Sequence, residues 1–319
     1  MVQSFLHAKL IHNLCYILNI RDNSSILLAI SCGQDSLCLL QLFIDLKNIL
    51  NLNLAILYID HQWREDSNDN TKHIINMTKK LDCPLYIYQL NPRKYSEAEF
   101  RDMRYQIYIE TACRYTYDTV ATAHTSSDVT ETCLIQIVKG SNIDSLNSLR
   151  WKRQIYENIS LVRPLLNFTR AEITWFCKYY QLPIWSDYTN IYYTCNRNRL
   201  RHELIPYLKQ YHQIDIEKNI HRFLRKTYYD TEYLRQTTIK IYLSIKHPLY
   251  AAFNYKLLLI QHKCVQLRVL HIFLAHNTNI TWNYESLDHI IHRLNRRKNM
   301  KKSRIKIQLK TYNNWAYLL

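Results

Sequence analysis

A short loop of small and polar residues joins an apolar run to a helix start near the beginning of the chain. Residues 31–36 read Ser-Cys-Gly-Gln-Asp-Ser, residues 26–30 before them are apolar, and an amphipathic segment begins at Leu37. The N–H groups in the first turn of a helix have no partner inside the helix, and the helix dipole favours an anion there. Gly33 is one of only two glycines in 319 residues, so composition alone would rarely place it here. We interpret the loop as a phosphate-binding turn between a strand and a helix.

Four apolar runs alternate with helical patterns over the first part of the chain. Runs at residues 26–30, 52–59, 85–90 and 119–123 predict buried strands, with helices ending near residue 81 and spanning residues 96–115. Such alternation predicts a parallel sheet with right-handed crossovers. Ser31, Asp60 and His124 each follow a strand end, where parallel sheets bind ligands. The sequence therefore predicts that three separate motifs meet in one crevice.

The rest of the chain is predicted to be mainly helical. Helical patterns start near residues 130, 169 and 197, and a long connecting helix is predicted over residues 216–240. A separate helical unit follows, with one strand predicted at residues 305–309. We expect two domains, 1–215 with the crevice and a helical extension, and 216–319 with the long helix and the helical unit.

The charge of the chain indicates its kind of partner. The formal charge of +16 and the isoelectric point near 9.4 favour a polyanion such as a nucleic acid, although an AT-rich genome also produces a Lys-, Asn-, Ile- and Tyr-rich chain. The nine cysteines include no CxxC pair and no metal-ligand spacing, which predicts reduced core thiols. The first residues have no apolar signal core, and no apolar run is long enough to span a bilayer. We therefore expect that the protein does not associate with a membrane and that it works in the compartment in which it is made.

Six motifs, in order along the chain, carry a resemblance to a known family. The loop at residues 31–36 resembles the SGGxDS signature of the N-type ATP pyrophosphatases, with Cys32 in place of the first glycine. With the other motifs, the chain resembles the tRNA(Ile)-lysidine synthases, in their plastid or cyanobacterial form, over about residues 24–225. The other motifs are Asp60-His61-Gln62-Trp63-Arg64, Arg101-Asp102-Met103-Arg104-Tyr105, Ala123-His124-Thr125-Ser126-Ser127-Asp128 with Glu131-Thr132, Arg163-Pro164-Leu165-Leu166, and Asp187 through Asn190 to Arg197-Asn198-Arg199-Leu200-Arg201-His202.

The resemblance implies a fold and a reaction. The fold is α/β, with a parallel-sheet PP-loop ATPase domain, Rossmann-like and of the adenine nucleotide alpha hydrolase type, followed by a mainly helical C-terminal region. The implied activity is ligation of free L-lysine to the wobble cytidine of the CAU anticodon of tRNA(Ile), which changes decoding from AUG to AUA. ATP first adenylates the cytidine, and AMP and pyrophosphate are released.

The resemblance also implies roles for individual residues. Asp35 is expected to hold Mg²⁺, Arg101 or Arg104 to neutralise the developing charge, and Asp128 and Glu131 to bind lysine. The expected ATP-binding residues are Ser31, Cys32, Gly33, Gln34, Asp35, Ser36, Asp60 and His61, the catalytic residues are Asp35, Arg101, Arg104, His124, Asp128 and Glu131, and the tRNA-binding residues are Arg197, Arg199, Arg201, Arg296, Arg297, Lys301 and Lys302.

Plainer structural interpretations stay open for several of these residues. Asp35 could interact only with the helix dipole, Asp60 and His61 could form a capping pair, and His124 could bond the backbone at its strand end. Arg101 and Arg104 share a helix face on which solvated ion pairs are routine. The basic segment at residues 197–202 could brace the catalytic domain instead of contacting RNA.

Two other functions and two locations also stay open. A related PP-loop enzyme could thiolate tRNA, but the cysteine sets for sulfur transfer or an iron–sulfur cluster are not recognisable. A tRNA-binding protein with a decayed ATP loop is the third interpretation, suggested by Cys32. We expect the protein to be organelle-encoded and to work in the plastid stroma, the alternative being a bacterial cytoplasm. The sequence does not decide the oligomeric state, and a homodimer stays open.

Overall fold

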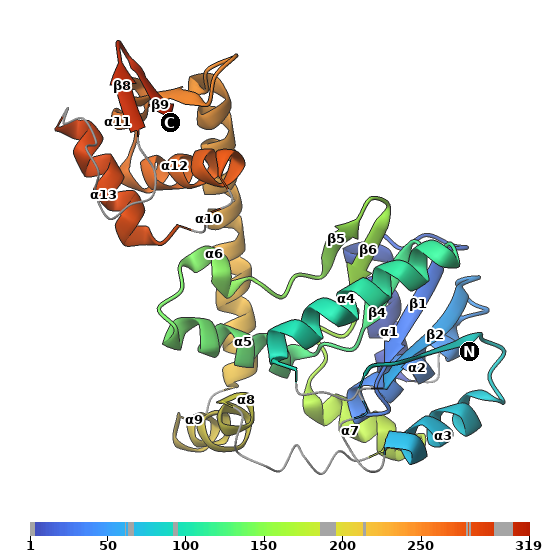
Figure 1. The fold of residues 1–319 in the computed structure, drawn as a ribbon. Coiled ribbons are helices and arrows are strands. Elements are labelled where there is room, and N and C mark those ends of the chain that lie inside the picture. The colour runs from blue at the N-terminus through green and yellow to red at the C-terminus, as the bar shows by residue number, and fades with distance from the viewer. Residues whose placement is uncertain are drawn as a thin grey trace. The chain divides into compact units, whose positions relative to one another are not determined.

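The computed structural model divides the chain into two compact units, Met1–Leu224 and Arg225–Leu319 (Figure 1). It describes residues 4–60, 62, 67–91, 95–185, 196–212, 215–278, 280, 282–296 and 309–319. The division falls within the long helix α10 (Ile216–Ile245), which was expected at residues 216–240. The boundary expected between residues 215 and 216 marks the start of that helix.

The first unit is built on a six-stranded sheet in the order β3-β2-β1-β4-β6-β5. Its strands are β1 (Ser25–Ile30), β2 (Asn53–Asp60), β3 (Leu85–Gln89), β4 (Thr119–Thr122), β5 (Lys152–Tyr156) and β6 (Ile159–Val162). All neighbouring strands pair in parallel except β5 and β6, which are antiparallel. The four predicted strands and their parallel arrangement are confirmed.

The helices between these strands cover both faces of the sheet. They include α2 (Gln34–Leu46), α3 (Ser67–Thr78), α4 (Glu97–Arg114) and α5 (Ser126–Val138). Alternate residues of β1 point to opposite sides: Leu28 packs into the core that contains α2, whereas Leu27 packs into the core that contains α4. Because both sides are buried, β1 is an uninterrupted apolar run instead of an alternating one.

The remaining helical elements of the first unit are short. They are α1 (Phe5–His12) with the π-helical turn Asn13–Ile17, α6 (Ile143–Leu146), α7 (Arg170–Tyr179), and α8 (Asn196–Arg199), which continues through the π-helical turn Leu200–Leu204 into α9 (Ile205–His212). Helix α7 starts where it was predicted, because Thr169 and Glu172 form a capping box at its N-terminus.

The hairpin formed by β5 and β6 was not among the strands predicted from the sequence, which was expected to be helical from near residue 130. The helical pattern holds only for α5 and α6. Strand β5 has exposed Lys152, Arg153 and Gln154 and therefore no apolar alternation, whereas β6 has only four residues. This hairpin is structurally important because it brings the residue after β6 to the edge of the sheet next to β4.

The second unit is mainly helical, as expected, and also contains a small antiparallel sheet in the order β7-β9-β8. Its elements after α10 are β7 (Ala252–Asn254), α11 (Tyr255–Leu259), α12 (Lys263–Asn277), α13 (Tyr284–Asn295), β8 (Leu309–Tyr312) and β9 (Trp315–Leu318). Of the strand predicted at residues 305–309, only Leu309 is described, and it begins β8. In the described part of the chain, no helix has the length and apolarity required to cross a membrane.

Candidate active site at the carboxyl edge of the sheet

The loop after β1 is folded onto the first turn of α2 by Ser36. The Ser36 hydroxyl donates to the carbonyl of Gly33 at 2.8 Å and accepts from the backbone N–H of Ser31 at 3.2 Å. Gly33 is the N-cap of α2, and no described side chain accepts a hydrogen bond from the first N–H groups of this helix. Within the described residues, the loop therefore presents a helix N-terminus whose first N–H groups have no side-chain partner, an arrangement suited to an anion; the binding of a phosphate there stays a prediction.

Cys32 has the unusual backbone conformation in this loop. Its φ angle is +60°, in the left-handed region, whereas Gly33 has an ordinary φ of −74°. A side chain with a Cβ in this region costs about 1–2 kcal/mol, which a glycine avoids. A Cβ on Gly33 would lie 3.6 Å from the Ser31 hydroxyl oxygen, an ordinary contact. The positive φ thus falls on the position at which the family signature has its first glycine.

The Cys32 side chain is part of the hydrophobic core. It is fully buried, and burial raises the pKa of its thiol to about 12, so the sulfur is protonated at neutral pH. Its carbonyl accepts a hydrogen bond from the N–H of Trp185 at 3.1 Å. Cys32 therefore contributes packing and backbone shape rather than a reactive thiolate.

Asp35, in the first turn of α2, is the acid of the loop. Burial, followed by the nearby negative charge of Asp128, raises the pKa of its carboxyl to about 6, and Glu131 adds to the effect. Among the described residues, nothing forms a hydrogen bond or an ion pair with this carboxylate. These electrostatic effects indicate that the loop after β1 lies near the two acids of α5.

A magnesium ion fits this arrangement only together with a phosphate ligand. In the described part of the chain, no three His, Cys, Asp or Glu side chains are grouped to hold a metal by themselves. Mg²⁺ usually takes one or two protein carboxylates and completes its shell with water and substrate phosphates. A single unpaired carboxylate beside a phosphate loop suits that chemistry.

Asp128 and Glu131 lie one turn apart near the start of α5 and bind two arginines. Arg197 donates from Nε to the Glu131 carboxylate at 2.5 Å and from Nη2 to Asp128 at 2.6 Å. Arg201 donates from Nε to the other oxygen of Glu131 at 2.6 Å. Asp128 also caps α5 by accepting from the backbone N–H of Thr125 at 2.8 Å.

This network joins residues that the sequence analysis assigned to different ligands. Asp128 and Glu131 were expected to bind lysine, whereas Arg197 and Arg201 were expected to bind tRNA. In the structure the two arginines pair with the two acids, whereas Arg199 is largely exposed and lies 3.4 Å from Glu203. The contacts correspond to the bracing role that stayed open for residues 197–202.

Asp60 lies at the end of β2 and is almost completely buried. One of its carboxylate oxygens accepts from the N–H of Gln62 at 3.0 Å and the other from the Thr71 hydroxyl at 3.3 Å. Through these contacts Asp60 stabilises the chain that follows β2. A role of Asp60 in ATP binding stays a prediction. His61 lies outside the described residues.

His124 follows β4 at the same edge of the sheet. Burial lowers the pKa of its imidazole to about 4, and the cationic neighbours Arg163, Arg197 and Arg104 add to this against the attraction of Asp128. Its Nδ1 lies 3.0 Å from the Thr122 hydroxyl. His124 is therefore a neutral hydrogen-bonding group at neutral pH and not a cation.

Arg101 and Arg104 are exposed residues on the first half of α4. The Arg101 guanidinium lies 5.7 Å from the ring centre of Tyr105, and Arg104 lies close enough to His124 to affect its pKa. A third arginine of this region, Arg163, had no predicted role, although the motif Arg163-Pro164-Leu165-Leu166 is part of the family resemblance. A single charge within the apolar stretch at residues 161–166 was the signal that could have identified it.

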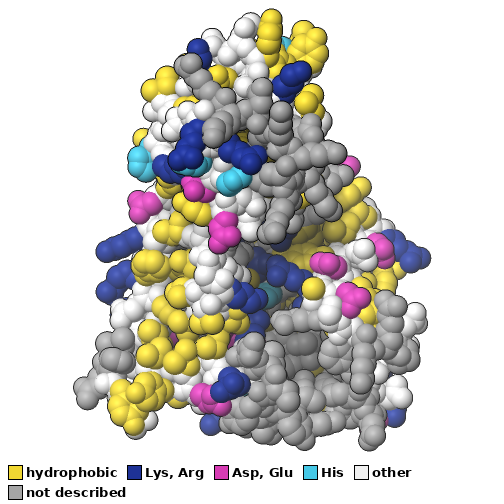
Figure 2. Space-filling view, turned by 60° about the vertical axis from the view of Figure 1, so that its left-hand side comes forward, with side chains coloured by type: hydrophobic (Ala, Val, Ile, Leu, Met, Phe, Trp, Pro, Cys, Tyr) yellow, Lys and Arg dark blue, Asp and Glu magenta, His cyan; other side chains and the backbone are white. Residues whose placement is uncertain are grey.

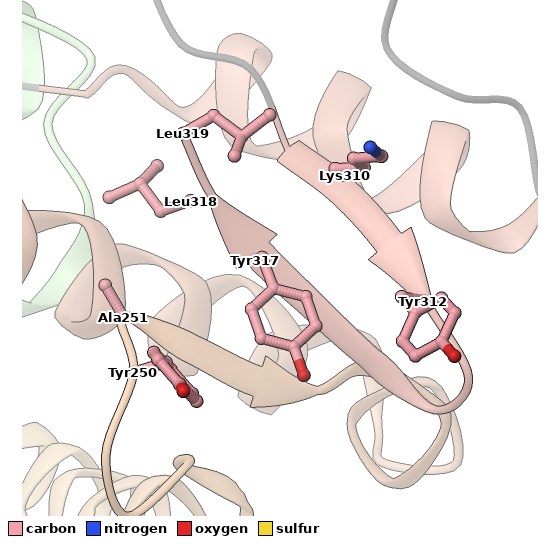
Figure 3. A pocket seen from close by; sticks show the side chains of 7 residues that line it. All are labelled: Tyr250, Ala251, Lys310, Tyr312, Tyr317, Leu318 and Leu319. Atoms are coloured by element: carbon pink, nitrogen blue, oxygen red, sulfur yellow. The ribbon is translucent and has the colours of Figure 1, made fainter.

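The second unit has a separate pocket of about 450 Å³ (Figure 3). Tyr250, Tyr312, Tyr317 and Lys310 line it, and Lys310 and Tyr317 are cross-strand neighbours on β8 and β9. Its lining residues among the described ones include no acid and none of the residues of the site above. Of the basic residues expected to bind tRNA in this unit, Arg296 is described and exposed, whereas Arg297, Lys301 and Lys302 lie outside the described residues.

Comparison with known proteins identifies the class to which this arrangement belongs. A model of the PP-loop domain matches residues 6–208, the part of the chain that carries the parallel sheet and the phosphate loop. A similar fold occurs in the U34-tRNA thiolase NcsA from Methanococcus maripaludis, with a TM-score of 0.55, 16% identity, and coverage of 69% of this chain and 77% of that chain. At this identity the likeness shows the fold alone. Fold and site thus define a PP-loop protein.

Curated relatives identify the family within this class. The sequence is 40% identical over 323 residues to the chloroplastic tRNA(Ile)-lysidine synthase of Gracilaria tenuistipitata var. liui, with 100% of both chains covered. It is 35% identical over 315 residues to that of Pyropia yezoensis, with 99% of this chain and 96% of the relative covered. The chain belongs to the tRNA(Ile)-lysidine synthase family.

Proposed function

We propose that the protein ligates free L-lysine to the wobble cytidine of the CAU anticodon of tRNA(Ile), at the expense of ATP. One observation carries the proposal: Asp35 of the phosphate loop lies within electrostatic reach of Asp128 and Glu131. A nucleotide and an amine substrate could therefore meet at this edge of the sheet. The names of the full-length relatives support the same reaction.

Two steps are needed because the carbonyl oxygen of cytosine is a poor leaving group. The oxygen first attacks the α-phosphorus of ATP and pyrophosphate leaves, and the lysine amine then displaces AMP, which carries the oxygen away. This sequence divides one high barrier into two lower ones. The N–H groups at the start of α2, and the arginines of α4, would stabilise the phosphate charge that develops in the first step.

A magnesium ion bound by Asp35 and the ATP phosphates would supply additional positive charge at the leaving pyrophosphate. The protein's own contribution is a carboxylate without another described partner, held at the head of α2 beside the loop. Ser31, Gly33 and Ser36 would cradle the phosphates. The absence of a side chain at Gly33 keeps the approach to these N–H groups open.

The acids of α5 would bind the amino groups of lysine. A lysine amine has a pKa of about 10.4, so it must lose a proton before it can attack. Glu131 is fully buried and both acids already bind arginines, so lysine has to join or replace a guanidinium there. Neutral His124 could accept a hydrogen bond from the amine, but with a pKa of about 4 it is too weak a base to hold the proton that the amine loses.

The second unit would bind the tRNA. Residues 225–319 contain 17 Lys and Arg against four Asp and Glu, so most of the +16 formal charge lies in this unit. Figure 2 shows Lys and Arg side chains on the face of the molecule that it draws. Exposed Arg296, with Arg297, Lys301 and Lys302, would contact phosphates, and the tyrosines of the pocket offer surfaces on which bases can stack.

The experiment that tests the proposal is transfer of radiolabelled lysine to an unmodified CAU-anticodon isoleucine tRNA, with ATP and Mg²⁺. The control is the same tRNA with the wobble cytidine changed. Incorporation that requires this cytidine is the expected result. Tight tRNA binding without incorporation would contradict the proposal and would favour thiolation or a binding-only function.

We also propose that the protein works in a plastid. Two relatives that are covered over 96% or more of their length are chloroplastic, and others are cyanobacterial. Cell fractionation with an antibody against the protein tests this location, and recovery outside the plastid fraction would exclude it.

A further inference from the structure

Arg163 is a buried cation without an acidic partner among the described residues. It is only 2% exposed, and its guanidinium donates from Nη1 to the carbonyl of Arg150 at 2.7 Å and from Nη2 to the Tyr105 hydroxyl at 3.4 Å. Its Nε is buried and has no acceptor in the part of the chain that the structure describes. A buried charge with only neutral acceptors and one unpaired donor is costly, unless a ligand supplies the opposite charge.

Other arginines surround Arg163 and increase this cost. Arg101 of α4 and Arg153 of β5 lie 5.7 and 5.8 Å from the ring centre of Tyr105, which Arg163 also contacts. Burial, and the positive charges of these two arginines, lower the pKa of Arg163. Arg104 follows Arg101 by three residues and therefore shares its helix face. In the described part of the chain, none of these four guanidinium groups pairs with a carboxylate.

This arrangement is the opposite of the one around Glu131. There, the fold itself supplies the negative charge that pairs with Arg197 and Arg201, namely the carboxylate of Glu131. Around Tyr105, the fold gathers positive charge and leaves the negative charge to be supplied from outside.

The position of this cluster suits a ligand. Arg163 directly follows β6, and the pairing of Lys152 with Val162 places the start of β5 beside it. Strand β6 is parallel to β4, which His124 follows, so Arg163 and His124 lie at the same edge of the sheet. This is the edge at which parallel sheets bind their ligands.

We propose that Arg163, with Arg101, Arg104 and Arg153, forms a second anion site that binds a phosphate group during the reaction. Guanidinium groups are suited to this because their planar forks donate two parallel hydrogen bonds to phosphate oxygens. The phosphate belongs either to the polyphosphate of ATP or to the backbone of the RNA substrate. The choice of these two sources rests on the proposed function, whereas the anion site itself rests on the arginines alone.

The test compares Arg153→Gln and Arg163→Lys with Arg114→Gln in the full chain. Arg153 and Arg114 are both exposed and both lie over a tyrosine ring, at 5.8 and 5.5 Å, so their removal changes the same charge and the same kind of contact. Arg114 is at the other end of α4 and serves as the control. Arg163→Lys keeps the positive charge but removes the planar guanidinium group. If the Arg163→Lys variant does not fold, Arg153→Gln still tests the proposal.

Two binding measurements distinguish the sources. Calorimetry gives the affinity for ATP without RNA, and fluorescence anisotropy gives the affinity for a CAU anticodon stem–loop RNA over a range of salt concentrations. A loss of about tenfold in one of these affinities for Arg153→Gln and Arg163→Lys, with Arg114→Gln unchanged, is expected. A loss of ATP affinity would show that the bound phosphate belongs to the polyphosphate of ATP. A loss of RNA affinity, with the salt slope of RNA binding reduced by about 0.7 to 0.9 for Arg153→Gln, would show that it belongs to the RNA backbone.

Unchanged affinities for both ligands in both variants would overturn the proposal. That outcome is distinct from failure of the proposed function, which would appear as no lysine incorporation by the wild-type protein whatever the binding results.

Discussion

The Glu131 carboxylate is fully buried and lies 2.5 Å from the Nε of Arg197, a residue from a different part of the first unit. Arg201 binds the second oxygen of the same carboxylate at 2.6 Å. Both oxygens are therefore occupied, and one acid fixes the segment that starts at α8 against α5. The acids expected to bind lysine are also part of the framework of the catalytic unit.

The first prediction concerns this buried acid. Glu131→Gln should lower the free energy of unfolding by about 3 kcal/mol, because the two arginines then share the single carboxylate of Asp128 as their counter-charge. Urea unfolding measures the change. Glu203→Gln is the control, since Glu203 is an exposed partner of Arg199 and should change stability by no more than about 0.5 kcal/mol. Equal effects of the two substitutions would show that burial adds nothing to the Glu131 contacts.

The second prediction concerns the pH dependence that Asp35 imposes. Its pKa rises from 3.8 to about 6 on folding, mainly through burial and the charge of Asp128. At pH values between these two pKa values, the folded state binds more protons than the unfolded chain. Asp35 therefore makes the free energy of unfolding decrease as the pH rises from about 4 to about 6. Asp35→Asn should remove this effect and raise the free energy of unfolding at pH 8 by on the order of 2–3 kcal/mol.

Urea unfolding of both proteins at pH 4 and pH 8, without nucleotide, measures the difference. The same variant should lose lysine transfer but keep its affinity for tRNA, since the carboxylate is needed only for the chemistry. A variant as active as the wild type would remove Asp35 from the mechanism.

The third prediction concerns the left-handed residue of the phosphate loop. Cys32→Val should destabilise the protein by about 1–2 kcal/mol, because a β-branched side chain is poorly tolerated at a φ of +60°. Cys32→Gly relieves the backbone but empties a fully buried position, so its stability should stay within about 1 kcal/mol of the wild type. Thermal unfolding compares the two variants.

Lysine transfer by Cys32→Gly should equal or exceed that of the wild type, because the loop keeps its shape. Loss of transfer in this variant, with stability unchanged, would mean that the thiol itself has a role.

The fourth prediction concerns the basic end of the second unit. Neutralising Arg296, Arg297, Lys301 and Lys302 should weaken tRNA binding and reduce its salt slope by about 0.7 to 0.9 for each phosphate that the protein no longer neutralises. The affinity for ATP should not change, because no part of the phosphate loop is altered. Filter binding at several salt concentrations measures the slope.

A charge-matched control separates a local effect from net charge. Lys79, Lys80, Lys139 and Lys178 are exposed lysines of the first unit, and replacing them with Gln removes the same four charges. A similar decrease of the slope in both proteins would argue against a binding surface at residues 296–302.

Much of the first unit could be predicted because its signals are local. The apolar run of β1, the polar turn after it and the amphipathic start of α2 each satisfy a rule that acts over a few residues. Strand β5 could not be predicted in this way, because its exposed, polar residues carry no alternation. Its hydrogen bonds to β6 specify it instead.

The sequence alone determined the phosphate loop, the parallel sheet, the edge at which the motifs meet and the family, since all of these depend on local patterns and motif order. The tertiary structure alone decided which charges meet. Glu131 pairs with Arg197, a residue 66 positions further along the chain, while Arg163 meets Tyr105 and no described acid. The physical reason is that burial and distance in space determine the energy of a charge, and neither quantity is encoded in the neighbouring residues.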